Sequence, residues 1–378
     1  MKASRERLNS ICPRPDGGAD ETDEETKDMI FSSPCKYVQD PGALGSVGNW
    51  AALLGKSALV IVASRDRERL GGLIAESLAR SGVNSDIRTF DGDSAMHDIV
   101  RLAGLASACD MVIGVGSGRI MDASKAVAHF AQMPVIVCPT VASTDAPCSG
   151  LSVVNEPQGG RYLPLGTCPD VVIADSAIIA SAPVRFTVAG MGDALTTCYE
   201  ARACERSGHE VNGRASLTAR TLAALCRDTI LTYGEEAKTD LDNGELSDAV
   251  ENIIEANILI SGLGFENCGL AAAHALERAI TEKNGKGMHG EKTAFGLLVQ
   301  LTLEGDARER ERVAKFCKNV GLPVTLDEIG LPATEEVAVE IAALACAEGT
   351  SMANMPVSHD ERAVAEAILA AHAYGKTL

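Results

Sequence analysis

Two histidines and one aspartate lie in segments of the chain that are otherwise small and apolar. His274 closes the run Gly-Leu-Ala-Ala-Ala-His at residues 269–274, and His289 follows fifteen residues later. Upstream, Asp193 is the lone carboxylate in Ala-Gly-Met-Gly-Asp-Ala at residues 189–194. Two imidazoles and a carboxylate from separate helices would hold a metal through three protein ligands and leave one position open, as in catalytic zinc sites. The alternative is that both histidines are hydrogen-bonded core residues and that Asp193 caps a helix.

A glycine-rich loop at residues 114–118 follows a predicted strand and opens a predicted helix. Gly116 and Gly118 allow a tight backbone turn and a close approach to a ligand, and the N–H groups at the helix start favour a pyrophosphate. The loop departs from the G-x-G-x-x-G pattern, because the position of the last glycine falls at Arg119 or beyond. The alternative is a tight strand–helix connection that binds nothing.

A second polar loop, at residues 139–149, follows the next predicted strand. Open α/β sheets bind ligands at the carboxyl ends of their strands. The hydroxyls of Thr140, Ser143 and Thr144 could therefore bind a phosphate or a nicotinamide amide. Asp145 could accept a hydrogen bond from a substrate hydroxyl. The alternative is a turn stabilised by these short side chains, but the neighbouring glycine loop favours binding.

The composition limits the partners and the compartment. Hydrophobic residues make up 46% of the chain and charged residues 23%, which is typical of a folded globular protein. A net charge of −18 disfavours nucleic acid and anionic membranes as partners. The twelve cysteines form no C-x-x-C pair, so we expect free thiols, a reducing compartment and a cytoplasmic location. No apolar run approaches the roughly 18 residues of a membrane span.

The order of predicted elements indicates two parts. Residues 29–182 alternate between apolar strands and amphipathic helices, which predicts an α/β domain with a parallel sheet covered on both faces. Residues 183–378 carry only helical patterns and predict an all-α domain. Residues 1–28 are polar and acidic and predict a disordered tail. The predicted strands lie at 58–63, 85–90, 110–115, 135–138 and 171–174, and long helices at 213–233 and 245–265 are among those predicted beyond residue 183.

Together these motifs resemble the glycerol dehydrogenase branch of the superfamily of iron-containing alcohol dehydrogenases and dehydroquinate-synthase-like enzymes. The resemblance runs from about residue 30 to 375. Its most specific segments are residues 139–149, 169–171, 182–186, 190–200, 255–274 and 289–292.

The resemblance implies a Rossmann-like domain and a helical domain with the cleft between them, and a homo-oligomer. It also implies that Asp193, His274 and His289 bind zinc and that Asp145 contacts a polyol substrate. The residues expected to line an NAD cofactor are Gly116, Ser117, Gly118, Arg119, Asp122, Thr140, Ser143, Ser149, Leu151 and Ser64.

Several positions depart from the pattern of the family, and three of them concern the metal or the cofactor. Iron-dependent relatives carry a further histidine one turn after the aspartate, where this chain has Thr197; the loss of that ligand favours zinc over iron. Relatives often carry an aspartate for the adenosine ribose where this chain has Ser64, so we expect NADP to be accepted more readily than usual. Glu277 replaces a common histidine one turn after His274. It either orients a metal ligand or, as we expect, is a solvated helix residue.

We therefore expect a zinc-dependent polyol dehydrogenase that oxidises glycerol, or a related vicinal diol, to dihydroxyacetone with hydride transfer to NAD+. One alternative is a glycerol-1-phosphate dehydrogenase, which would need a cationic pocket near His289, where Lys283, Lys286 and Lys292 are the main bases. Another is a dehydroquinate-synthase-like lyase with the same fold and cofactors. Net NADH formation from glycerol separates the dehydrogenase from the lyase.

Overall fold

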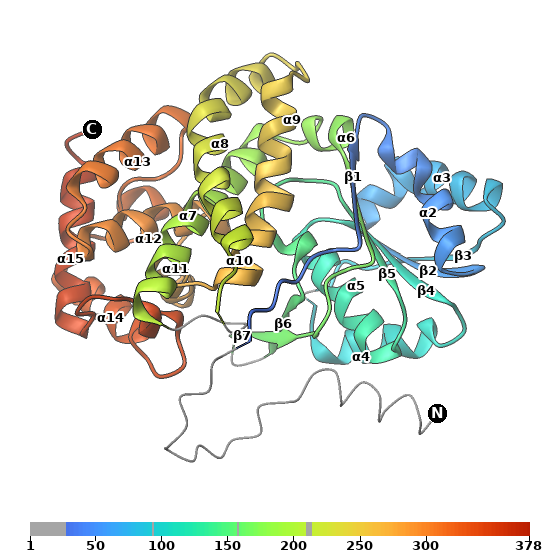
Figure 1. Cartoon of the computed structure of the whole chain (residues 1–378), viewed down its shortest axis with the longest axis horizontal. Coiled ribbons are helices and arrows are strands. Elements are labelled where there is room, and N and C mark those ends of the chain that lie inside the picture. Colours follow the sequence, from blue (N-terminus) through green and yellow to red (C-terminus); the bar gives the residue numbers. More distant parts are fainter. Residues whose placement is uncertain (1–27, 93, 157–158, 209–213) are drawn as a thin grey trace.

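The computed structural model describes residues 28–92, 94–156, 159–208 and 214–378. The tail predicted for residues 1–28 therefore lies outside the described residues, apart from Asp28. In Figure 1 the sheet with its helices occupies one side of the molecule and a helical part occupies the other. This is the predicted combination of an α/β part with a parallel sheet and a helical part.

Six parallel strands form the main sheet, in the order β1-β8-β5-β4-β2-β3. The inner strands are fully buried or nearly so, because both faces are covered by helices. A separate antiparallel hairpin, β6-β7, follows β5. The strands are β1 (Lys36–Asp40), β2 (Ser57–Val62), β3 (Asn84–Thr89), β4 (Met111–Gly116), β5 (Val135–Pro139), β6 (Leu151–Glu156), β7 (Gly159–Pro164) and β8 (Val171–Asp175).

Alternate side chains of each strand point into two different apolar layers. On β2, Val60 and Val62 pack with the helices α2 and α3, whereas Leu59 and Ile61 pack with α4 and α5. The second layer continues without a break into the helical part, so the two parts share one buried core. The helices of the α/β part are α2 (Val47–Leu54), α3 (Ser64–Arg80), α4 (Met96–Ala106), α5 (Gly118–Ala131) and α6 (Ser176–Ala180).

Only helices follow β8 in the described residues. The long helix α7 packs against α8, α10 and α12 and lies inside this part (Figure 1). None of the described helices is long and apolar enough to cross a membrane. The helices are α7 (Val184–Ser207), α8 (Leu217–Asp242), α9 (Asp248–Glu255), α10 (Ser261–Cys268), α11 (Ala272–Glu282), α12 (His289–Leu303), α13 (Ala307–Val320), α14 (Glu335–Ala345) and α15 (Glu361–Gly375).

Several elements differ from the sequence-based expectation. The strand β1 was not predicted, because it lies at an edge of the sheet and its sequence KYVQD is largely polar. The hairpin β6-β7 lies in a stretch predicted to be irregular, since it has few apolar residues in a row. The helix predicted over 245–265 is interrupted by a π-helical turn, Ala256–Ile260, and the one predicted over 213–233 runs from Leu217 to Asp242.

Candidate active site

The three predicted metal ligands converge on one point in the helical part. Asp193 comes from α7, His274 from α11 and His289 from the first position of α12. The Nε2 atoms of His274 and His289 each lie 3.3 Å from Oδ1 of Asp193. The candidate ligand atoms all lie within 4.8 Å of one another. Three residues that are up to 96 positions apart in the chain therefore form one cluster.

Small residues around Asp193 allow the helices to come this close. A Cβ on Gly290 would lie 1.8 Å from the carbonyl oxygen of Ala189, and one on Gly192 would lie 2.3 Å from that of Gly290. A side chain at either position would push α12 away from α7. The Ala/Gly-rich sequence around the predicted ligands is therefore what brings His289 to Asp193.

Glu200 fixes the orientation of the His274 ring. Its Oε2 lies 2.6 Å from Nδ1 of His274, so the other ring nitrogen, Nε2, faces Asp193. Its Oε1 accepts hydrogen bonds from the backbone N–H groups of Ala271 and His274, at 2.8 and 3.1 Å. Sequence reasoning gave Glu200 no role. The available signal was its position two helical turns after Asp193, on the same face of the helix.

Glu277 orients the ring of the second histidine, His289. It is buried rather than solvated, which corrects the expectation for this residue. Its Oε2 lies 3.2 Å from Nδ1 of His289, and its Oε1 lies 3.3 Å from Nζ of Lys292. A carboxylate on the outer nitrogen of a histidine is the usual support of a metal-binding imidazole. Both histidines of the cluster have such a support.

The electrostatics of the cluster favour a cation. Neither carboxylate oxygen of Asp193 accepts a well-aligned hydrogen bond from the described residues, although both are fully buried. Burial opposes ionisation of Asp193, but the facing imidazoles of His289 and His274 lower its pKa below the ordinary value. Burial also opposes charge on the two histidines, yet the carboxylates around them raise their pKa values well above the usual range. A buried carboxylate that accepts no well-aligned hydrogen bond and faces two oriented imidazoles fits a divalent metal ion.

Asp145 lies beside this cluster, in the loop after β5. Its Oδ2 accepts a hydrogen bond of 2.7 Å from the hydroxyl of Ser261, which lies 2.9 Å from Oγ1 of Thr197. Burial and the negative charge of Asp193 raise the pKa of Asp145 to about 7. Thr197, at the position where the family pattern predicted a further histidine in iron-dependent relatives, thus shares a hydrogen bond with Ser261.

The predicted glycine loop connects β4 to α5. Gly116 has a φ of +156°, and a Cβ there would lie 2.6 Å from the side chain of Ile120, so only glycine fits. Ser117 is the N-cap of α5 and Gly118 its first residue. Arg119 is exposed. The backbone N–H groups of this helix start therefore lie at the carboxyl end of the central strand, where phosphate groups bind in such sheets.

The polar loop after β5 lies beside the glycine loop. The backbone N–H of Thr140 donates to the carbonyl oxygen of Gly116 at 2.9 Å, and its hydroxyl donates to Asp66 at 3.1 Å. Ser143 and Thr144 are half-buried in the same loop. Ser64, the remaining predicted cofactor residue, starts α3 at the end of the neighbouring strand β2.

A buried lysine that sequence reasoning missed organises the end of this loop. Nζ of Lys125 donates to the carbonyl oxygens of Ala146, at 2.7 Å, and Leu151, and lies 3.2 Å from the hydroxyl of Ser149. Asp122 lies one turn away on α5, 3.7 Å from the same ammonium group, and burial raises its pKa to about 6. Ser149, Leu151 and Asp122 were predicted to line the cofactor, and the structure joins them through Lys125. A lysine in an otherwise buried helix was the available signal.

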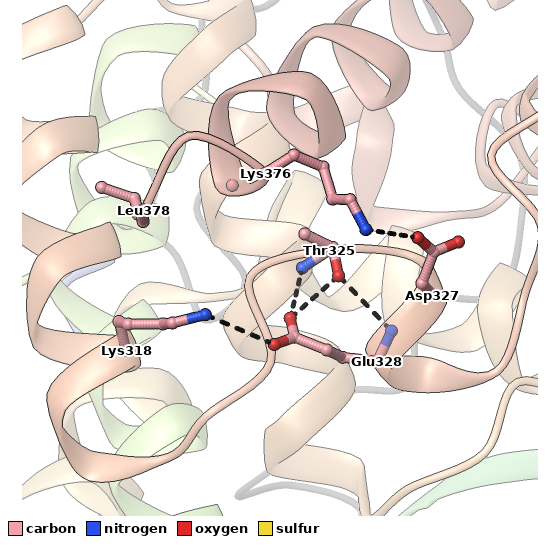
Figure 2. A pocket seen from close by; sticks show the side chains of 7 residues that line it. Lys318, Thr325, Asp327, Glu328, Lys376 and Leu378 are labelled. Carbon is pink, nitrogen blue, oxygen red and sulfur yellow. Dashed lines mark hydrogen bonds and ion pairs between the residues drawn. The ribbon is translucent and has the colours of Figure 1, made fainter.

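A separate hollow lies where α13 ends and the chain terminates (Figure 2). Both of its lysines face carboxylates: Nζ of Lys376 lies 2.9 Å from Asp327, and that of Lys318 lies 3.9 Å from Glu328. None of its lining residues belongs to the cluster around Asp193. This hollow is unrelated to the candidate active site.

Comparisons with known proteins agree with this geometry. Residues 38–183 match the family model of iron-containing alcohol dehydrogenases. The glycerol dehydrogenase of Thermotoga maritima is 43% identical, with 91% of this chain and 96% of the relative covered. The glycerol dehydrogenase of Citrobacter freundii is 41% identical, with 92% and 98% covered.

A solved structure shows the same fold. The crystal structure of glycerol dehydrogenase from Schizosaccharomyces pombe superposes with a TM-score of 0.90 at 36% identity, covering 94% of this chain and 93% of that one. The similarity thus extends over both the sheet and the helical part that carries the Asp193 cluster. The chain belongs to the glycerol dehydrogenase branch of the iron-containing alcohol dehydrogenases and is an alcohol oxidoreductase.

Proposed function

We propose that the protein oxidises glycerol, or a related vicinal diol, to dihydroxyacetone or the matching hydroxyketone, with NAD+ as the hydride acceptor and zinc at Asp193, His274 and His289. The observation that carries this proposal is the buried carboxylate of Asp193, which accepts no well-aligned hydrogen bond from the described residues and faces two imidazoles that are each oriented by a glutamate. The relatives named above support glycerol as the substrate.

The donor set supports zinc as the metal. Two imidazole nitrogens and one carboxylate oxygen leave a coordination position open for a substrate oxygen. The same set also suits ferrous iron, but Thr197 stands where iron-dependent relatives have a further histidine. Because Thr197 is hydrogen-bonded to Ser261, this turn of α7 adds no fourth protein ligand.

The residues of the chain would position the reactants. A divalent cation held here would supply Lewis acidity toward an alcohol oxygen, and a nicotinamide would supply the hydride acceptor. Asp145, fixed through Oδ2 by Ser261, would accept a hydrogen bond from a neighbouring hydroxyl of the polyol and so orient it. The glycine loop and the start of α5 would hold the pyrophosphate. Glu200 and Glu277 keep both Nε2 atoms directed at the reaction centre.

The alternative of a phosphorylated substrate has little support near the cluster. Lys283 lies 2.5 Å from Glu340, and Lys292 lies 3.3 Å from Glu277. Lys286 is exposed on the loop before α12. Two of the three candidate bases are therefore already paired with carboxylates, and an unphosphorylated polyol fits these surroundings better.

A substrate panel tests the proposal. We expect net formation of reduced nicotinamide with glycerol, 1,2-propanediol or 2,3-butanediol, and at least about tenfold lower kcat/KM with glycerol 1-phosphate, because Lys283 and Lys292 are already paired with carboxylates. Absorbance of reduced nicotinamide measures both. Turnover of the phosphorylated substrate alone would favour a glycerol-phosphate dehydrogenase. The absence of net NADH with every diol would favour the lyase.

We also propose that the protein acts in the cytoplasm as a homo-oligomer. The cysteines in the described residues are all free thiols, which supports a reducing compartment. Large apolar side chains on the surface, such as Leu53 and Leu217 at 75% exposure each, support contacts between subunits.

A further inference from the structure

The carboxyl ends of three neighbouring strands meet beside the glycine loop. Val62 of β2 pairs with Val115 of β4 on one side and with Thr89 of β3 on the other. The residues that follow these strands therefore lie along one edge of the sheet, with Ser64 between Gly116 and Asp91. The cofactor proposed for the glycine loop would extend its adenosine half along this edge.

The end of the strand beside the glycine-loop strand normally provides an acidic side chain that binds the ribose hydroxyls of NAD. Here that position is Ser64, and on this ground the sequence predicts weak discrimination against NADP. In the structure, however, a carboxylate reaches the same place from the next strand. Oδ1 of Asp91 accepts a hydrogen bond of 2.9 Å from the backbone N–H of Ser64, and Oδ2 accepts one from its hydroxyl.

The contacts of Asp91 oppose a 2′-phosphate in two ways. Asp91 is exposed, and its hydrogen bonds to Ser64 lower its pKa, so it carries a negative charge toward the ligand. It also occupies an N–H group at the start of α3, where an anion would otherwise bind. Of the two arginines that could pair with a 2′-phosphate, Arg67 donates to the carbonyl oxygen of Ile87 at 2.6 Å. Only the exposed side chain of Arg65 then remains to pair with a 2′-phosphate.

We propose that Asp91, from the end of β3, replaces the missing acid at Ser64 and selects NAD(H) over NADP(H). The proposal rests on the proposed function, since it assumes a dinucleotide at the glycine loop. The carboxylate would accept hydrogen bonds from the ribose 2′- and 3′-hydroxyls of NAD and would repel the 2′-phosphate of NADP.

Binding measurements test this without turnover. Isothermal titration calorimetry with NADH and with NADPH gives the ratio of their dissociation constants for each variant. For the wild type we expect NADH to bind at least about tenfold more tightly, and for Asp91→Ser we expect this ratio to fall by about tenfold or more. The double variant Ser64→Asp/Asp91→Ser returns the carboxylate to the edge and should restore the preference. Asp86→Asn removes an equal charge from β3, where Asp86 pairs with Arg88 at 2.8 Å, and should leave the ratio unchanged.

Each outcome decides between the proposals. An unchanged ratio in Asp91→Ser, with both ligands still bound and the thermal unfolding temperature retained, overturns the role of Asp91 and leaves the proposed function intact. An equal change of the ratio in Asp86→Asn also overturns the role of Asp91, because the loss of any negative charge on β3 would then have the same effect. A wild type that binds neither dinucleotide overturns both this role and the proposed function.

Discussion

Replacing His289 by alanine is expected to lower kcat with glycerol by about a thousandfold or more, because the lost ligand removes Lewis-acid stabilisation of several kcal/mol. The Nε2 atom of His289 lies 3.3 Å from Asp193 at the first position of α12, and none of the described contacts links it to the glycine loop. Binding of NADH should therefore stay within about threefold of the wild type, a change well below 1.4 kcal/mol. Steady-state kinetics and NADH titration measure the two effects separately.

His97→Ala is the matched control. His97 is a surface histidine on α4 whose side chain is 82% exposed, so its loss should change neither quantity. Retained turnover in His289→Ala would remove the residue from the metal site. A parallel loss of NADH binding would show that the substitution disturbs the whole molecule.

The second large effect is expected from Glu200→Gln. The amide oxygen of glutamine can accept the N–H groups that Oε1 now accepts from Ala271 and His274. Its NH2 group then faces Nδ1 of His274 as a donor, which moves the ring proton to Nε2 and removes the lone pair needed for the metal. We expect zinc affinity to fall by about 10- to 100-fold. Competition with a chromophoric chelator measures this affinity.

Glu309→Gln provides the comparison for this variant. Glu309 accepts a hydrogen bond of 2.8 Å from the hydroxyl of Tyr199, the neighbour of Glu200 on α7, and has no contact with the cluster in the described residues. The zinc affinity of the Glu309→Gln variant should equal that of the wild type. If both variants lose zinc equally, Glu200 stabilises the helix and does not set the histidine tautomer.

The sequence was most informative where a polar, chemically reactive side chain lies in an otherwise small and apolar run. His274, His289 and Asp193 are polar residues in small apolar runs, and such residues need either a partner or a metal. The glycine loop could be recognised because its glycines lie between a predicted strand and a predicted helix, and in the structure Gly116 has no room for a side chain. The apolar parallel strands were predicted for a similar reason, since strands covered on both faces carry continuous apolar runs.

What could not be predicted depends on contacts between distant segments. Glu277 looks like an ordinary surface glutamate until α11 and α12 bring it to His289. Glu200 and Lys125 act through hydrogen bonds to segments that lie elsewhere in the chain. Asp91, which we propose as the residue that selects NAD, is brought to Ser64 by the pairing of β2 with β3, and the sequence alone does not show this pairing. The edge strand β1 has no apolar pattern, because its surroundings are half exposed.

The proposed reaction requires a metal ion bound by Asp193, His274 and His289. The measurement that tests it is turnover of glycerol by the purified protein after exhaustive chelation, with metal content determined on the same sample. We predict that turnover is lost while NADH binding is kept, and that stoichiometric zinc restores turnover to the wild type but not to His289→Ala. Full turnover by protein that contains no metal would contradict it.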